Sequence, residues 1–410
     1  MSLLDRLSDP GSWQEFYEYK TSLACPKEFE RELKAFMDAR AYLPVCESIA
    51  KGERFPLPRR AVISKLHSQK KRTVYIYPPA ENTVLKLLTW LLLRTYDGLF
   101  SDGLYSFRPG RSAKDAIRRL TRLPGIRRMY AYKVDISNYF NSIPVRLLLP
   151  MLREAVGEDA PLCVFLERLL EEEEVLDGEK RIREQKGIMA GTPLASFYAN
   201  LYLKELDRYF AERQIPYARY SDDIIVFADS REGTEAYAET IRRFLSEAGL
   251  TVNPSKEQYF APQEGWTFLG FAYKEGEIDI APVTVAKLKA KMRRKTRALL
   301  RWSRRNGVEG EKAAAAFIRI FNRKLLENAG DSELTWSCWF FSVINTTKNL
   351  RVIDEYARDC IRTLAVGTRT KARFNLRYDD MKKLGYRNLV HAYYEYIRAE
   401  KTQENRRTSQ

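Results

Sequence analysis

Histidine and cysteine are scarce in this chain, and their scarcity argues against several kinds of site. The chain has two histidines, His67 and His391, so neither a zinc site nor a histidine-based catalytic triad is expected. Its five cysteines are widely spaced, odd in number and without a C-x-x-C pair, which predicts reduced, structural thiols. The cysteines are Cys25, Cys46, Cys163, Cys338 and Cys360.

Long apolar runs are also missing. The longest, Val84 to Leu93, contains Lys86 and ends at Arg94, which is far short of a membrane span. The stretch from Met1 to Pro10 has no basic segment leading into an apolar core, so no secretory signal is visible. We therefore expect a cytoplasmic protein with no membrane partner.

The composition is that of a folded, basic protein. With 410 residues, 45% of them hydrophobic, the chain can form two or three packed units. Its 70 basic residues against 54 acidic ones give a formal charge of +16, which suits a polyanionic partner whose phosphates bind lysine and arginine. A basic protein without such a partner is the alternative.

Two acidic positions suggest a metal site. The segment Tyr217–Ala228 places Asp222 and Asp223 between an aromatic run and a β-branched run, which predicts a hairpin with an acidic turn. Asp135 closes a second alternating segment and can face that turn across a sheet. Carboxylate oxygens are the ligands that Mg2+ prefers. Singly, the aspartate pair could also be a solvated turn, and Asp135 an N-cap.

Together these stretches resemble motifs C and A of reverse transcriptases: a Tyr-x-Asp-Asp hairpin, and an aspartate followed five residues later by an aromatic, Phe140. The resemblance implies that Asp135 and Asp222 bind two Mg2+ ions, for which Mn2+ can substitute, with Asp223 as the supporting acid. The resemblance also implies that Ile136, next to Asp135, belongs to the metal site. Phe140 would pack under the sugar and exclude a 2′-hydroxyl.

Residues 185–203 resemble motif B of the same family. Gly191 would let the backbone approach a base pair, with Ala190 beside the nucleotide and Asn200 near nucleic acid. Many family members have Pro-Gln-Gly where this chain has Met189-Ala190-Gly191, so the glutamine contact to the nucleotide is missing. This departure concerns fidelity and sugar discrimination rather than metal binding.

Two later segments resemble motifs D and E. Lys256 occupies the motif D position near the leaving pyrophosphate and would protonate it, although an ordinary surface lysine is the alternative. Residues 266–271 resemble the hairpin that holds the primer end, with Leu269 and Gly270 at its turn.

Two segments before motif A are similar to the fingers of bacterial reverse transcriptases. In the basic turn that begins at His67, Arg72 and Lys71 are candidates for gripping the incoming nucleotide, and a solvated charge run is the alternative.

The run Tyr-Ser-Phe-Arg-Pro-Gly-Arg-Ser-Ala at 105–113 is close to a stretch of group II intron reverse transcriptases, with Ser106 in place of a glycine. Ser112 would cap a helix and leave Arg108 and Arg111 free for template phosphates. Pairing of these arginines with acids of the fold fits the residues equally.

Several segments have helical periodicity: 28–40, 81–93, 146–170, 235–248 and 284–324. The last is strongly basic, and its cations Lys291, Arg294 and Arg297 are candidates for phosphate contacts along a nucleic-acid duplex. A calmodulin-type or membrane-surface helix is the alternative.

The fold class implied is α+β, a right-handed polymerase with an antiparallel palm sheet and a helical thumb. The predicted domains are an N-terminal helical extension (1–55), fingers (56–129), a palm (130–275) with a fingers insertion at about 146–186, a basic helical thumb (276–335) and a C-terminal helical region (336–410).

The function implied is RNA-directed DNA synthesis, with an RNA template, a DNA primer and product, and deoxynucleoside triphosphates as partners; a homo-oligomer is possible. The chain lacks a Cys/His nuclease module, the Asn-Ala-x-x-His and Val-Thr-Gly features of retron enzymes, and the Ser-Gln of diversity-generating enzymes. What remains is the group of compact bacterial reverse transcriptases of antiphage defence, which act with a dedicated noncoding RNA. A template-independent or RNA-making polymerase, or an RNA-binding protein without turnover, are the alternatives.

Overall fold

A computed structural model describes residues 2–23, 25–64, 71–185, 187–327, 336–368 and 370–408. The predicted basic turn at 67–70 and Lys186 of the motif B segment lie outside these ranges, as does the side chain of Cys338. The other four cysteines are free thiols, as expected. The chain forms two compact units, Met1–Leu23 with Glu28–Pro262, and Ala24–Lys27 with Gln263–Gln410.

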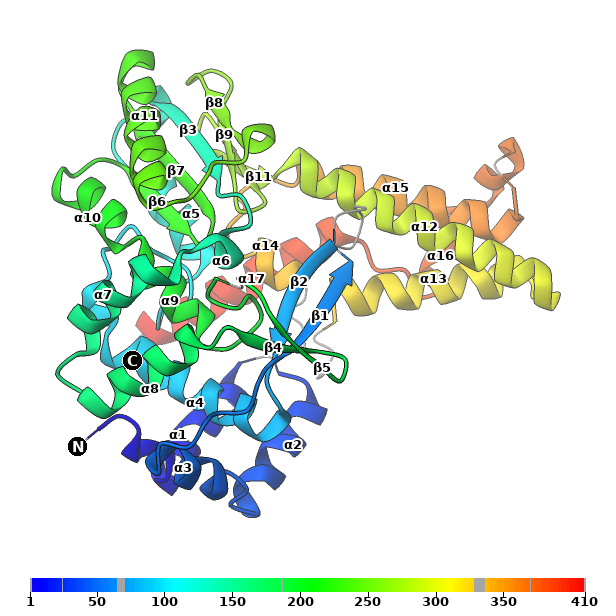
Figure 1. Ribbon diagram of the computed structural model, residues 1–410. Helices are drawn as coiled ribbons and strands as arrows, with labels where there is room; N and C mark the ends of the chain where they lie inside the picture. The colour runs from blue at the N-terminus through cyan, green and yellow to red at the C-terminus, as the bar shows by residue number, and fades with distance from the viewer. Residues whose placement is uncertain are drawn as a thin grey trace. The chain divides into compact units, whose positions relative to one another are not determined.

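The first unit contains a sheet that we call the β3 sheet. Its strand order is β6-β7-β3-β8, and every neighbouring pair is antiparallel. The strands are β6 (Tyr217–Tyr220), β7 (Asp223–Ala228), β3 (Tyr130–Asp135) and β8 (Gln258–Phe260). Helix α11 (Arg231–Glu247) packs against β3 and β7 (Figure 1). Because β3 and β7 are nearly continuously buried, their register is fixed by packing on both faces.

A second sheet of this unit, the β1 sheet, has the order β2-β1-β4-β5. Its strands are β1 (Arg59–Ser64), β2 (Lys71–Ile76), β4 (Glu174–Asp177) and β5 (Lys180–Arg183). The pair β1 and β4 is parallel, and the other pairs are antiparallel. Strands β4 and β5 form a hairpin whose turn contains Gly178, with a φ of +64°.

Helices surround both sheets and supply most of the core. Those of the first unit besides α11 are α1 (Pro10–Ser22), α2 (Lys27–Asp38), α3 (Leu43–Ala50), α4 (Pro79–Thr95), α5 (Ala113–Arg122), α6 (Tyr139–Ser142), α7 (Val145–Val156), α8 (Ala160–Glu171), α9 (Ala195–Tyr202) and α10 (Lys204–Glu212). Short 3-10 helices are η1 (Asp5–Leu7), η2 (Asp97–Leu99), η3 (Ile126–Arg128) and η4 (Pro254–Lys256).

The predicted helices at 28–40, 81–93 and 235–248 correspond to α2, α4 and α11. The segment 146–170 was expected to be helical throughout, but the structure breaks it between α7 and α8, where Asp159 caps the second helix by accepting a hydrogen bond from the Leu162 N–H. An N-cap aspartate starts a new helix because its carboxylate satisfies a free backbone donor.

The second unit combines a small sheet with long helices. Its strands have the order β11-β10-β9 and are β9 (Trp266–Phe268), β10 (Phe271–Lys274) and β11 (Glu277–Ile280). Its helices are α12 (Pro282–Asn306), α13 (Gly310–Leu325), α14 (Trp336–Phe340), α15 (Lys348–Val366), η5 (Lys371–Asn375), α16 (Tyr378–Lys383) and α17 (Leu389–Thr408). The predicted helical segment 284–324 is therefore two helices, separated at Gly307, whose φ of +60° ends α12.

The α+β class, with an antiparallel sheet and a helical C-terminal region, is confirmed. The two compact units meet in sequence at residues 262 and 263, inside the segment predicted as palm, and the five-part division stays a prediction. Among the described residues, no helix combines the length and the apolar character that crossing a bilayer requires.

Candidate active site

Three carboxylates from two strands meet at one end of the β3 sheet. Asp135 is the last residue of β3, and Asp223, the first residue of β7, is its partner in the antiparallel register. Asp222 lies in the turn just before β7. Carboxylate oxygens of Asp135, Asp222 and Asp223 all lie within 4.8 Å of one another. The structure thus brings together the three acids that the sequence singled out.

The acidic turn is held by its backbone. Ser221 has a φ of +59°, so the chain reverses sharply between β6 and β7. The Ile136 N–H donates to the carbonyl of Asp222 at 3.0 Å, which ties the turn to the residue after Asp135. The Ile136 side chain is buried and apolar, so a metal could take only the backbone carbonyl of this predicted metal-site residue.

A buried ion pair beneath the turn was missed in the sequence. Arg219 and Asp207 have fully buried side chains, and the guanidinium donates to the two Asp207 oxygens at 2.8 and 2.5 Å. Arg219 also donates to the carbonyls of Ser221 and Asn200, each at 3.3 Å. An arginine inside the strand segment Tyr-Ala-Arg-Tyr was the available signal, because a charge between buried residues requires a partner.

Asp135 is fixed by the loop that precedes β8. The Asn253 N–H donates to the Asp135 carbonyl at 2.7 Å, and its side-chain amide lies 3.4 Å from Asp135 Oδ1. The Lys256 ammonium donates to Asp135 Oδ2 at 2.5 Å. Lys256 was predicted as an acid for the leaving group, and the structure places it against the cluster. Asn253 was not predicted.

The electrostatics of the cluster suit a divalent cation. Burial, followed by the charges of Asp222 and Asp135, raises the pKa of Asp223 to about 6. Burial and Asp135 also raise the pKa of Asp222, against the lowering effect of Lys256 and Arg72. A group of carboxylates that is this crowded and desolvated favours a bound positive charge. Three oxygen donors in one place are also the ligand type that Mg2+ and Mn2+ accept, so the residues fit such an ion.

Two of the predicted nucleotide-binding residues lie together beside the cluster. The Arg72 guanidinium lies 5.8 Å from the centre of the Phe140 ring, and Phe107 contacts the same ring edge to face. Arg72 and Lys71 are exposed at the start of β2. Because Phe140 follows β3 and Arg72 lies on β2, the contact joins the two sheets of the first unit at this site.

Asn141, on helix α6 just after β3, joins the motif B loop to strand β2, and it was not predicted from the sequence. Its side-chain oxygen accepts from the Ala190 N–H at 3.1 Å, and its amide donates to the Thr73 carbonyl at 3.2 Å. The Ala190 carbonyl in turn accepts from the Tyr75 N–H at 2.8 Å. The signal was present in the Asn-Tyr-Phe-Asn run of motif A, where a second asparagine follows the aromatic.

Gly191 has a physical role other than the expected one. Its φ is +101°, and a Cβ there would lie 3.1 Å from Val74 and 3.2 Å from the Tyr75 carbonyl. The close approach that requires glycine is therefore to strand β2 of this chain. The expected approach of the Gly191 backbone to a base pair stays a prediction.

Three predicted nucleic-acid contacts are engaged within the protein, two of them in buried positions. Arg108 is buried and donates to both Asp97 oxygens, at 2.7 and 2.9 Å, so the expectation that it is free for a template was wrong. Arg111 forms an ion pair with Asp102. Asn200 is fully buried, and its amide donates to the Ser106 carbonyl at 2.8 Å. Both arginines pair with acids that precede them by about ten residues, which was the alternative, and Asn200 bonds a residue far away in sequence. Ser112 caps α5 as predicted.

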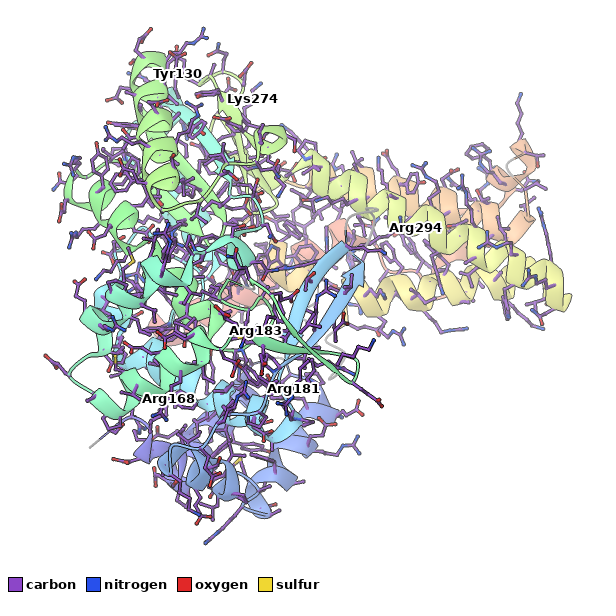
Figure 2. All side chains as sticks on the ribbon, viewed as in Figure 1. Tyr130, Arg168, Arg181, Arg183, Lys274 and Arg294 are labelled. Carbon is purple, nitrogen blue, oxygen red and sulfur yellow. The ribbon has the colours of Figure 1, made fainter. Side chains whose placement is uncertain are left out.

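The remaining candidates belong to the second unit. Leu269 and Gly270, with φ values of +50° and +89°, form the turn between β9 and β10. Lys291, Arg294 and Arg297 are exposed on α12, whereas Met292 and Leu299 are buried. Figure 2 shows Arg294 on this helix. The spacing of three residues places the cations on one side of the helix, as a phosphate-binding surface requires.

Known proteins resemble parts of this chain. Protein YkfC of Escherichia coli (strain K12) is 24% identical over 266 residues, which are 55% of this chain and 68% of that protein. The group II intron-encoded protein LtrA of Lactococcus lactis subsp. cremoris is 25% identical over 182 residues, or 44% of this chain. The chain spans about 30% of the length of LtrA.

Among solved structures, apo telomerase from Candida tropicalis gives a TM-score of 0.46 at 12% identity, covering 81% of this chain and 69% of that one.

The family comparison covers the whole site. The family model described as reverse transcriptase (RNA-dependent DNA polymerase) matches residues 63–273, just over half of the 410 residues. The matched region includes the three aspartates, Arg72, Phe140, the motif B loop and Lys256. The chain therefore belongs to the reverse transcriptase family, the RNA-dependent DNA polymerases.

Proposed function

We propose that the three-aspartate cluster binds Mg2+, with Mn2+ as a substitute, and that the chain uses it to copy a dedicated noncoding RNA into DNA in bacterial antiphage defence. The observation that carries the proposal is the approach of Asp135, Asp222 and Asp223 to within 4.8 Å in a chain of this family.

The proposed division of labour follows from how each residue is held. Divalent metal ions bound there would supply Lewis acidity for nucleotidyl transfer. Asp135 offers oxygens that Asn253 and Lys256 orient, and Asp222 offers oxygens on a turn fixed by Ile136 and Arg219. Asp223 adds negative charge beside them. Lys256, already hydrogen-bonded to Asp135, is the proposed proton donor to the leaving pyrophosphate.

Selection of the nucleotide is assigned to Arg72 and Phe140. A guanidinium binds a phosphate through paired hydrogen bonds, and Arg72 lies over the aromatic ring that would pack under the sugar. Phe140→Ala should relax discrimination against ribonucleotides by about tenfold or more, since the ring no longer blocks a 2′-hydroxyl. Single-nucleotide incorporation kinetics with dATP and ATP measure the ratio, and an unchanged ratio contradicts the assignment.

The noncoding RNA and the defence role rest on what the chain contains. After the region that matches the family model, the second unit continues with basic helices. On α12, Lys291, Arg294 and Arg297 form an exposed cationic face. The stretches Asn375-Leu376-Arg377-Tyr378 and Leu384-Gly385-Tyr386 resemble tails of compact defence-associated members of the family. Sequencing of RNA that co-purifies with the protein, and phage plating with the Asp222→Asn variant, test the two parts separately.

The activity is tested with purified protein, a primed RNA, labelled deoxynucleotides and either Mg2+ or a chelator. We expect DNA product with Mg2+ only, and a loss on the order of 10⁴-fold in Asp222→Asn, because a carboxylate ligand cannot be replaced by an amide without loss of charge. Asp229→Asn is the matched control, since Asp229 is exposed just beyond the other end of β7. Equal synthesis by wild type and Asp222→Asn would contradict the assignment.

A further inference from the structure

A cluster of arginines surrounds an exposed aromatic ring at one end of the second unit. The sequence from Arg358 to Arg377 contains a single acid, Asp359, against six basic residues. Helix α15 ends at Val366, and the short helix η5 follows; in Figure 1 this segment lies at the tip of the long helices of the unit. We call the described members Arg358, Arg362, Lys371, Arg373, Phe374 and Arg377 the Phe374 patch.

Phe374 is the centre of the patch. It is 49% exposed, which is unusual for phenylalanine and leaves much of the ring open to a ligand. The Arg373 guanidinium lies 4.6 Å from the ring centre and that of Arg362 lies 5.4 Å from it. The patch thus presents a half-exposed aromatic ring with two guanidiniums over it, and aromatic rings and guanidinium planes both stack on unpaired bases while the cations attract the phosphates.

The positive charges are crowded and only partly compensated. Asp359 accepts a hydrogen bond from Arg373 at 3.0 Å. Partial burial lowers the pKa of Arg362, and the charges of Arg358, Arg373 and Arg377 lower it further, with Asp359 opposing them. Lys371 and Arg377 are exposed on either side of Phe374. An anion placed among these groups would relieve their mutual repulsion.

The geometry fixes the patch locally. Arg362 donates to the Leu376 carbonyl at 3.3 Å, which holds the chain after η5 against α15. Arg304 near the end of α12 donates to the Gly367 carbonyl at 3.1 Å, so a further cation borders the patch. Both bonds tie the segment that carries Phe374 to the long helices.

We propose that the Phe374 patch is a separate binding site for an unpaired segment of RNA, with a base stacked on Phe374 and the flanking phosphates held by Lys371, Arg373 and Arg377. The inference rests on the proposed RNA partner. A duplex presents phosphates but no free base face, so the ring makes the patch selective for unpaired nucleotides.

The test measures binding of a fluorescein-labelled 12-nucleotide RNA of non-self-complementary sequence to the full chain. An excess of unlabelled primed RNA occupies the surface that would bind the primer–template duplex. Fluorescence anisotropy is then recorded over a range of salt concentrations. Phe374→Ala should weaken binding about tenfold through lost stacking, with no change in the salt dependence. Lys371→Gln/Arg377→Gln should lower the slope of log affinity against log salt by about 1.4, because two phosphate contacts are lost.

Matched controls are exposed residues outside the patch. Tyr394→Ala removes another exposed aromatic of the same unit, and Arg208→Gln/Arg231→Gln removes two exposed cations of the first unit. These variants should bind the probe as the wild type does. Circular dichroism melts verify that Phe374→Ala is folded, and Phe374→Leu, which keeps an apolar side chain without the ring, serves as its second variant.

Each outcome decides the proposal. Wild-type affinity in Phe374→Ala, or an effect confined to the cation variant, would overturn it by showing a general anion surface. Equal losses for the single strand and for a 12-base-pair RNA duplex would overturn it as well. Binding is measured without polymerisation. A failure of DNA synthesis would therefore count against the proposed function, whereas the binding result would still test the Phe374 patch.

Discussion

The β3 sheet and the β1 sheet of the first unit each have four strands and carry charged side chains, but the charges meet different surroundings. In the first case, Arg219 of strand β6 and Asp207 of helix α10 are fully buried and satisfy each other, and Asp135 of β3 is 5% exposed. In the β1 sheet, the ion pair of Arg60 with Asp177 has side chains that are 29% and 51% exposed. Removing one partner of the buried pair leaves an uncompensated charge inside the protein, whereas water can solvate the charge left by the exposed pair.

This difference explains why the site lies where the two sheets approach. The β3 sheet supplies carboxylates whose positions are set by hydrogen bonds, and the β1 sheet supplies the exposed cations Arg72 and Lys71. Asn141 connects the two through Thr73 and Ala190. A rigid acidic centre facing an accessible basic strand suits a reaction of a nucleoside triphosphate.

The largest effect on stability is expected from Asp207→Ala. The change leaves the Arg219 guanidinium buried without its carboxylate, which costs about 3–5 kcal/mol of unfolding free energy. Urea denaturation followed by circular dichroism measures the loss. A cost below about 1 kcal/mol would remove the distinction between the sheets. Asp207→Asn, which keeps an oxygen acceptor, should be less damaging.

A smaller, pH-dependent gain is expected from Asp223→Asn in metal-free protein. Burial raises the folded pKa of Asp223 to about 6, above its ordinary value of 3.8, so the contribution of this residue to the free energy of unfolding is fully present below about pH 4 and is lost as pH rises through 6. Asparagine does not titrate, so the variant should gain roughly 1–3 kcal/mol above pH 6 and nothing below pH 4. Thermal melts in EDTA at pH 4 and pH 8 measure this, with Asp229→Asn as control. If Asp223→Asn were less stable than the wild type at pH 8, the expected repulsion among the three carboxylates would be contradicted.

Asn141→Ala tests the connection between the sheets. Loss of its two hydrogen bonds should reduce kcat/KM for deoxynucleotides about tenfold, mainly by displacing the motif B loop and β2 from each other. Steady-state kinetics on a primed RNA give the value. Asn141→Asp keeps the acceptor for the Ala190 N–H, so partial recovery is expected; equal loss in both variants would assign the role to the Thr73 contact.

The smallest effect is expected from Asp177→Ala in the β1 sheet. Its ion pair with Arg60 is exposed, and Arg60 also pairs with Glu184, so the unfolding free energy should change by less than about 1 kcal/mol. The same urea experiment serves as the counterpart of Asp207→Ala. A loss as large as that of Asp207→Ala would show that exposure does not separate the two sheets.

The residue pattern alone determined the acids and the elements that carry them. Strand β3, the β6–β7 hairpin and helix α4 follow from local alternation and helical periodicity, and these patterns depend on neighbours in sequence. Singly, Asp135, Asp222 and Asp223 also fitted an N-cap or a solvated turn; they were identified because the two stretches together resemble motifs A and C of reverse transcriptases. The role of Phe140 was likewise implied by that resemblance.

Only the tertiary structure decided which polar side chains have hydrogen-bond or ion-pair partners within the protein. Arg108 and Asn200 carry the same donors as an exposed arginine or asparagine, yet Asp97 and Ser106 engage them. Gly191 packs against β2, and Asn141 and Asn253 hold their neighbours through contacts made by folding. A side chain is free or satisfied according to partners that are distant in sequence, and local patterns do not carry that information.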